Sequence, residues 1–280
     1  MIEDVPGLAP EPSAALRRDA MNALGLLPAG ANVVMQLARL PIGRAVATST
    51  VTSGALTVHP FKRTRTTLGY LMISLLGTDE ERLRLRREVA RQHRFVRSAP
   101  DDAVAYNAAD PELQLWVAAC MYRGALDALR LINPDAPSAL LDELYARCAR
   151  FATTLQVEPS RWPKDRDAFD AYWAEATTLI AMDDVTRHYL WGIASLQFLP
   201  RPLPALLGPW HRVITAGFLP EPFRDELGLA WNPSRERVFH ATLRVAVAIN
   251  RRLPRILREF PLNLALRDAR RRLAHDGTFV

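Results

Sequence analysis

The feature that most restricts how this chain can fold is a pair of amphipathic segments separated by Gly77-Thr78. Apolar residues recur at helical spacing on both sides of this break: Leu68, Leu71, Met72 and Leu75 before it, and Leu85, Val89 and Val96 after it. Steps of three and four place such residues on one face of an α-helix. The acidic run Asp79-Glu80-Glu81 is typical of a first helical turn. We therefore predict a helical hairpin at the centre of the fold.

Three polar residues of this hairpin are expected to lie close together in the fold. Arg63 lies fifteen residues before Thr78, and His93 lies fifteen residues after it. At about 1.5 Å per residue, both would lie roughly 22 Å from the turn of an antiparallel pair. Thr67 shares a helix face with Arg63, and His93 continues the apolar stripe of the second helix. These three residues form the candidate site, although an inward imidazole with one or two hydrogen-bond partners can equally be an ordinary core residue.

Length and composition indicate one large all-α domain. The chain has 280 residues, 49% of them hydrophobic, which is enough to bury a large core. Most segments are rich in Ala, Leu and Arg with helical periodicity, whereas alternating Val, Ile and Thr occur only around residues 47–58. No glycine-rich or serine-rich linker divides the chain. We predict a flexible N-terminal tail at residues 1–12 and a single multi-helix domain at residues 13–280.

Prolines and capping residues divide the remaining sequence into segments. Asp110-Pro111-Glu112 is a typical helix start, because Asp can cap, Pro fits the first turn and Glu complements the helix dipole. Pro41 is expected to end a helix, and Pro254 is expected to kink one. The expected helices outside the hairpin cover residues 13–27, 32–40, 138–156, 167–182, 183–199, 234–260 and 262–274, with an irregular loop or distorted helix at residues 42–58. Pro200, Pro202 and Pro204 are expected to stop the helix at residues 183–199.

The cysteines and the N-terminal sequence indicate the cellular compartment in which the protein is expected. Cys120 and Cys148 are the only cysteines, and their spacing fits neither a metal site nor a redox motif. The N-terminal sequence MIEDVPGLAPEP lacks the apolar core of a signal peptide, and no run reaches the ~18 apolar residues of a membrane span. The cytoplasm is the predicted compartment.

Arginine dominates the charge of the chain. The net charge is +6, and eleven arginines lie between Arg235 and Arg272 against three acidic residues. Such a surplus can attract nucleic acid or anionic lipid. Nucleic acid is not an expected partner, because aromatic residues do not alternate with the arginines as stacking platforms would. Aliphatic residues do alternate with them at helical spacing, which fits a solvated helix face and leaves peripheral contact with a membrane open.

Three motifs give the chain a family resemblance. They are HPFKRTRTT with the YL that follows, the H-x-x-V-R of residues 93–97, and YNAADPELQLWV at residues 106–117. Together they resemble the rubber oxygenase and MpaB-type oxygenase family, and the LGLAW that follows Arg224 continues the resemblance. The resemblance implies a haem b-dependent oxygenase that takes O2 and a hydrophobic, isoprenoid-like or lipid-like small molecule. It implies His93 as the iron ligand, with Arg63 and Thr67 on the distal or propionate side and Arg224 near a propionate or a helix C-terminus.

Two departures from the family pattern bear on activity. Rubber oxygenases use a carboxylate upstream of the arginine, but no Asp or Glu lies between Asp19 and Asp79 in this chain. Many relatives carry W-V-H-A where this chain has Trp116-Val117-Ala118-Ala119. A catalytically inactive protein of the same fold that binds a hydrophobic ligand is therefore the alternative to an oxygenase.

Overall fold

A computed structural model describes residues 11–49 and 58–274, and in these residues the chain forms fourteen α-helices and two short 3-10 helices. The only β-type pairing among them is an isolated bridge between Arg97 and Asn107. The predicted all-α fold is confirmed. The predicted tail at residues 1–12 lies almost wholly outside the described residues.

The helices follow one another with short connections. In chain order they are α1 (Ala14–Ala20), η1 (Ala23–Leu26), α2 (Ala29–Leu37), α3 (Leu40–Ala47), α4 (Pro60–Leu76), α5 (Asp79–His93), α6 (Pro111–Ile132), α7 (Ser138–Thr154), η3 (Pro159–Arg161), α8 (Arg166–Thr177), α9 (Asp184–Ala194), α10 (Leu203–Phe218), α11 (Glu221–Leu227), α12 (Pro233–Arg252), α13 (Arg255–Glu259) and α14 (Leu262–Ala274).

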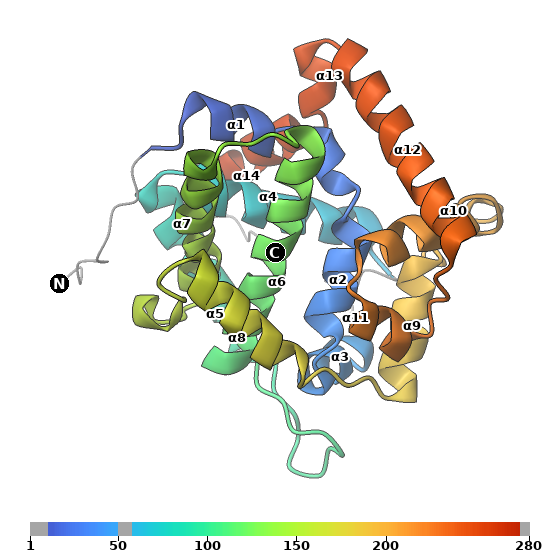
Figure 1. The fold of residues 1–280 in the computed structure, drawn as a ribbon. Helices are drawn as coiled ribbons and strands as arrows, with labels where there is room; N and C mark the ends of the chain where they lie inside the picture. Colours follow the sequence, from blue (N-terminus) through green and yellow to red (C-terminus); the bar gives the residue numbers. More distant parts are fainter. Residues whose placement is uncertain (1–10, 50–57, 275–280) are drawn as a thin grey trace.

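Helix α6 runs through the middle of the molecule, with α7 on one side of it and α2 on the other (Figure 1). It begins where the sequence predicts, because the Asp110 side chain accepts hydrogen bonds from the backbone N–H groups of Glu112 and Leu113. Trp116 and Cys120 on this helix have no exposed surface. Both core clusters of the protein include α6 residues, so this helix joins the two halves of the core.

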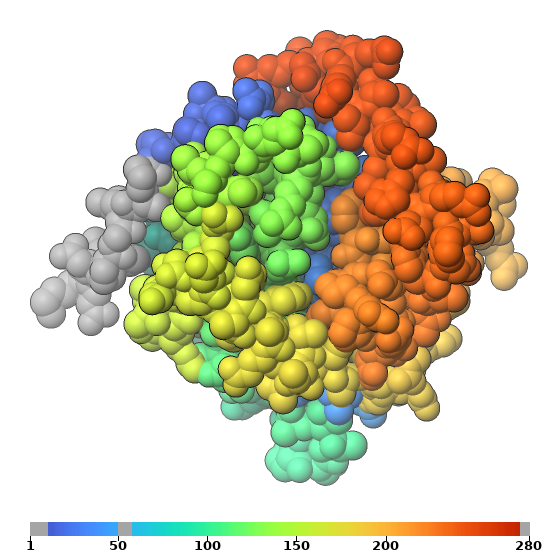
Figure 2. Space-filling view, in the orientation of Figure 1, coloured from blue at the N-terminus to red at the C-terminus, as the bar shows by residue number. Residues whose placement is uncertain are grey.

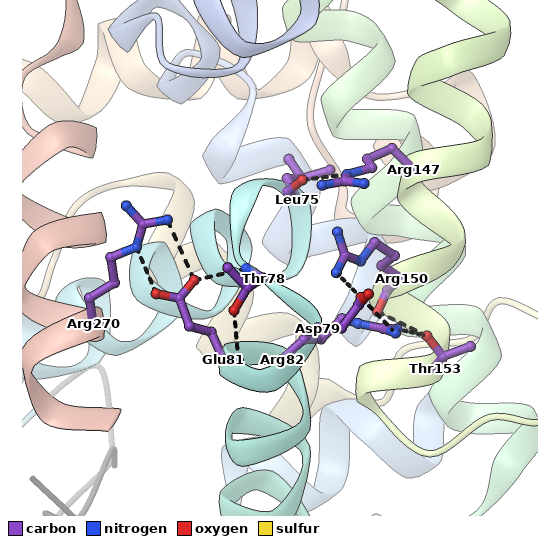
Figure 3. Close-up of polar contacts among 9 residues, drawn as sticks. All are labelled: Leu75, Thr78, Asp79, Glu81, Arg82, Arg147, Arg150, Thr153 and Arg270. Carbon is purple, nitrogen blue, oxygen red and sulfur yellow. Dashed lines mark hydrogen bonds and ion pairs between the residues drawn. The ribbon is translucent and has the colours of Figure 1, made fainter. Parts of the chain in front are cut away.

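The predicted hairpin is present as α4 and α5. Thr78 caps α5 in a capping box, in which its hydroxyl accepts from the Glu81 N–H and the Glu81 carboxylate accepts from the Thr78 N–H. This satisfies two backbone donors at the turn and fixes where the second helix begins. Figure 3 shows that the turn is also tied to neighbouring helices, since the Glu81 carboxylate pairs with Arg270 of α14 at 2.8 Å.

A buried polar network on the other side of the turn holds the hairpin against α7 (Figure 3). The Asp79 carboxylate lies 2.6 Å from Arg150 of α7, and Arg82 donates to the Thr153 hydroxyl at 2.7 Å. Arg147 donates to the Leu75 carbonyl at the end of α4, again at 2.7 Å. These contacts link three helices and so set the position of the hairpin that carries Arg63 and His93.

Several predicted boundaries are wrong, and proline explains most of them. Pro41 lies in the first turn of α3 instead of ending a helix, and residues 40–47 are helical. Pro204, expected to help stop the preceding helix, likewise lies in the first turn of the next one, α10. The segment at residues 13–27 breaks after α1 into the 3-10 helix η1. Pro254 ends the long C-terminal helix, so α12 and α13 are separate.

The length and hydrophobicity of the helices show whether any of them could span a membrane. No single helix in the described ranges is long and apolar enough to cross a membrane. One bent pair, Ala14–Ala20 with Ala23–Leu37, meets the length and composition requirements when its two parts are taken together. Location in the cytoplasm stays a prediction.

Candidate functional site

His93 is the last residue of α5 and is partly buried. Its Nδ1 atom is shielded from solvent and has no hydrogen-bond partner. A buried ring nitrogen in this state costs free energy unless some group satisfies it, so such an atom calls for an explanation. A histidine that binds a metal usually donates its other ring N–H to a carbonyl or carboxylate, and within the described residues Nδ1 of His93 has no such partner.

The electrostatic surroundings keep the His93 imidazole neutral. Its position at a helix C-terminus favours the protonated form, but burial and, next, the positive charge of Arg63 lower the pKa of His93 below its ordinary value. Desolvation and like-charge repulsion therefore outweigh the helix dipole. The neutral imidazole is the form that can donate a lone pair to a metal ion.

Arg63 stands in the first turns of α4, close enough to His93 for its charge to be felt there. The side chain keeps accessible surface, yet burial lowers the pKa of the Arg63 guanidinium. The Arg63 guanidinium is therefore close to many protein atoms but still reachable by solvent or a ligand. In the described residues Arg63 has no carboxylate within ion-pair distance. An anionic group of a ligand would offset its charge.

Tyr189 of α9 also responds to the charge of Arg63, and the sequence contained no signal for this relation. Burial raises the pKa of the Tyr189 phenol, and the Arg63 guanidinium opposes this rise. Arg63 and Tyr189 are 126 positions apart in sequence, so no spacing rule could connect them. The charge of Arg63 thus acts on both an imidazole and a phenol, and the three groups come from different helices.

The two remaining predicted site residues differ in their surroundings. Thr67 is exposed and lies one turn after Arg63 on the same face of α4. Arg224 of α11 donates to the Leu219 carbonyl at 2.7 Å and to the Ala216 carbonyl at 3.3 Å, and its guanidinium lies 5.3 Å from the centre of the Trp231 ring. Arg224 therefore caps the C-terminal end of α10, and a propionate contact by this residue stays a prediction.

The described residues contain no group of three or more His, Cys, Asp or Glu side chains able to hold a metal ion. Cys120 and Cys148 are both buried and unpaired thiols, as expected for small core residues.

Trp116 lies in an aromatic stack beside the buried residues Ala118 and Ala119. Trp116 stacks on Trp173 with ring centres 5.2 Å apart, and its indole N–H donates to the Gln36 carbonyl at 3.1 Å. Ala118 and Ala119 beside it are fully buried. These contacts give Trp116 and Trp173 a packing role in the core.

Comparison with known proteins places the chain. The family described as ER-bound oxygenase mpaB/B'/rubber oxygenase, catalytic domain, matches residues 17–248. The chain belongs to this family. An uncharacterised protein of Mycobacterium bovis and one of Mycobacterium tuberculosis are each 43% identical to it over 255 residues, which is 91% of this chain and 100% of each relative. No solved structure shows a significant match.

Membership of the mpaB/rubber oxygenase family makes this chain an oxygenase-type catalytic domain. The match includes α4, α5 and α9, which carry Arg63, His93 and Tyr189. It also includes the acid-free interval between Asp19 and Asp79.

Proposed function

We propose that this protein is a haem b-dependent oxygenase that acts on a hydrophobic small molecule. The observation that carries the proposal is the state of His93, whose buried Nδ1 is unsatisfied and whose imidazole is held neutral by burial and by Arg63. A neutral histidine with an unsatisfied ring nitrogen is suited to bind iron.

The residues present fit haem better than a bare metal ion. A non-haem iron site takes three protein ligands in the common two-histidine, one-carboxylate arrangement, and the described residues hold no group of three or more such side chains. In haem the macrocycle supplies the equatorial ligands, so one imidazole from the protein suffices. Bound haem iron would supply the activation of O2.

The other residues of the site have roles that follow from their chemistry. Arg63 is a cation without a carboxylate partner in the described residues, so it can hold a propionate of the cofactor or an anionic group of the substrate. The Tyr189 phenol, whose pKa is raised, remains protonated at neutral pH and can donate a hydrogen bond. Thr67 can donate or accept one through its hydroxyl.

The missing carboxylate limits the substrate. With no Asp or Glu between Asp19 and Asp79, no residue of that stretch can remove a proton in the way that the rubber oxygenases require. We therefore propose oxidation of a hydrophobic small molecule, isoprenoid-like or lipid-like, instead of polyisoprene cleavage.

Haem reconstitution tests the proposal. The wild-type protein should bind haem with a Soret band, His93→Ala should lose that band, and Arg63→Ala should weaken or shift it. His211→Ala is the matched control, since His211 is also partly buried with a pKa lowered by burial, but its Nδ1–H donates a hydrogen bond to the Ala194 carbonyl at 2.8 Å. Equal Soret absorbance in wild type and His93→Ala, or none in the wild type, would remove His93 from the mechanism.

A hydrophobic-ligand-binding protein without catalysis is the second candidate, and the acid-free interval favours it. Oxygen uptake by the haem-loaded protein with hydrophobic test substrates separates the two functions. Uptake that depends on His93 supports the oxygenase, whereas a colourless protein that binds a lipid supports the binding function.

A further inference from the structure

Helix α12 crosses the outside of the molecule, and most of its surface faces solvent. Figures 1 and 2 show it running along one edge of the fold, towards α13 at the periphery. Of its residues only Phe239 and Asn250 are buried. A surface helix normally places polar residues on its solvent side. Apolar residues on the solvent side of α12 would therefore indicate a binding partner.

The solvent side of α12 carries an aliphatic stripe. Val238, Val245 and Ile249 are 47%, 58% and 54% exposed, and their spacing of seven and four places them on one face. Helix α10 extends this apolar surface, because its Trp210 donates to the Thr242 hydroxyl of α12 at 3.2 Å. Further exposed apolar side chains lie on the adjoining helices: Leu206, Leu207 and Trp210 on α10, and Ile256 and Leu257 on α13.

A groove of about 320 Å³ lies between α12 and the end of α6. Leu131, Leu243 and Val247 contribute its apolar walls. Three arginines also line it, Arg130, Arg244 and Arg251. All three are exposed, and none has a carboxylate within ion-pair distance in the described part of the chain. The groove therefore combines apolar walls with uncompensated positive charge.

One acidic side chain of α6, Asp127, offsets part of this charge. Burial raises the pKa of Asp127 to about 6, and the nearby Arg123 and Arg130 oppose this rise. The carboxyl group is therefore mostly ionised at neutral pH, but a single negative charge does not balance the three arginines of the groove. A ligand that matches this surface needs an anionic group beside an apolar body.

We propose that the α12 surface, defined as the solvent side of α12 with the exposed stripe Val238, Val245 and Ile249 on one flank and the arginine-lined groove on the other, docks the protein on an anionic lipid bilayer. The arginines contact phosphate groups of the lipids, and the aliphatic residues enter the boundary between headgroups and acyl chains. A second copy of the chain fits less well, because a two-fold interface would place the arginines of one copy against those of the other. The proposal does not depend on haem binding.

Vesicle flotation with the full chain tests this docking. Wild type should float with phosphatidylcholine vesicles that contain about a third phosphatidylglycerol, but not with pure phosphatidylcholine, and high salt should release it. Replacing Arg130, Arg244 and Arg251 together by Gln should lower the partition coefficient on the order of a hundredfold, since each arginine near an anionic surface strengthens binding several-fold. The double variant Val245→Ser, Ile249→Ser should weaken the part of vesicle binding that persists at high salt, because this part depends on apolar contacts.

The matched control is Arg84→Gln, Arg87→Gln and Arg91→Gln on α5, which removes the same net charge from another helix. Circular dichroism establishes that each variant is folded. Equal losses of binding in the two triple variants would refute a specific surface, as would a wild type that does not float with anionic vesicles. A dimer in size-exclusion chromatography that Val245→Ser with Ile249→Ser dissociates would assign the surface to a second copy and overturn the proposal.

Discussion

Replacing Asp79 by Asn should destabilise the protein strongly, because it removes the carboxylate that serves two buried arginines. The Asp79 carboxylate lies 2.6 Å from Arg150 and 3.5 Å from Arg82, whose side chains are 7% and 9% exposed. Breaking a buried ion pair from one side costs about 3–5 kcal/mol, since a charge is left in the interior. Asp79 is itself 34% exposed, so we expect a loss at the low end of this range, about 3 kcal/mol.

Asp184→Asn is the matched control. Asp184 is also the first residue of its helix and pairs with an arginine three positions later, at 2.7 Å from Arg187, but its side chain is fully exposed. An exposed pair of this kind contributes less than about 1 kcal/mol. Both substitutions remove a charge that favours a helix N-terminus, so their difference measures burial.

Urea unfolding followed by circular dichroism gives both free energies by linear extrapolation. Asp79→Asn combined with Arg150→Met should cost less than Asp79→Asn alone, because the stranded charge is then removed as well. Equal losses for Asp79→Asn and Asp184→Asn would show that the network at the hairpin turn does not stabilise the fold in the way described here.

Two further predictions concern packing and pH. Gly208→Ala should lower the free energy of unfolding by about 1–3 kcal/mol, because a Cβ atom at this position would lie 2.6 Å from the Ser195 carbonyl oxygen. Gly192→Ala is the control and should be tolerated, because the new Cβ atom would lie near the flexible side chain of Gln197. Urea unfolding compares the two variants. The pKa values of His93 and His211 are both lowered in the folded state, so the unfolded chain binds more protons and stability should fall as pH drops from about 7.5 through 6.5. His93→Gln should reduce that slope, by at most about 1.4 kcal/mol per pH unit, and an unchanged slope would contradict the neutral buried imidazole.

The sequence by itself determined the class of fold and the hairpin at its centre. Helical periodicity around Gly77-Thr78 is a local property, and the capping residues Thr78 and Asp110 satisfy backbone groups within three residues of themselves. Such features need no information from distant parts of the chain. Proline misled the boundary predictions because it is accepted in the first turn of a helix and excluded from its interior, so Pro41 and Pro204 each read equally as an end or a beginning.

Only the tertiary structure decided the surroundings of the candidate residues. Equal spacing suggested that Arg63 and His93 would lie level, but the burial that lowers the pKa of His93 and the electrostatic influence of Arg63 on Tyr189 depend on how helices far apart in the chain are arranged. Arg150 and Arg244 both have apolar neighbours in sequence, yet their surroundings differ. Arg150 is buried beside Asp79, whereas Arg244 is exposed on α12. Local sequence sets which face of a helix is apolar, whereas contacts between helices far apart in the chain set which charges are enclosed and which remain in solvent.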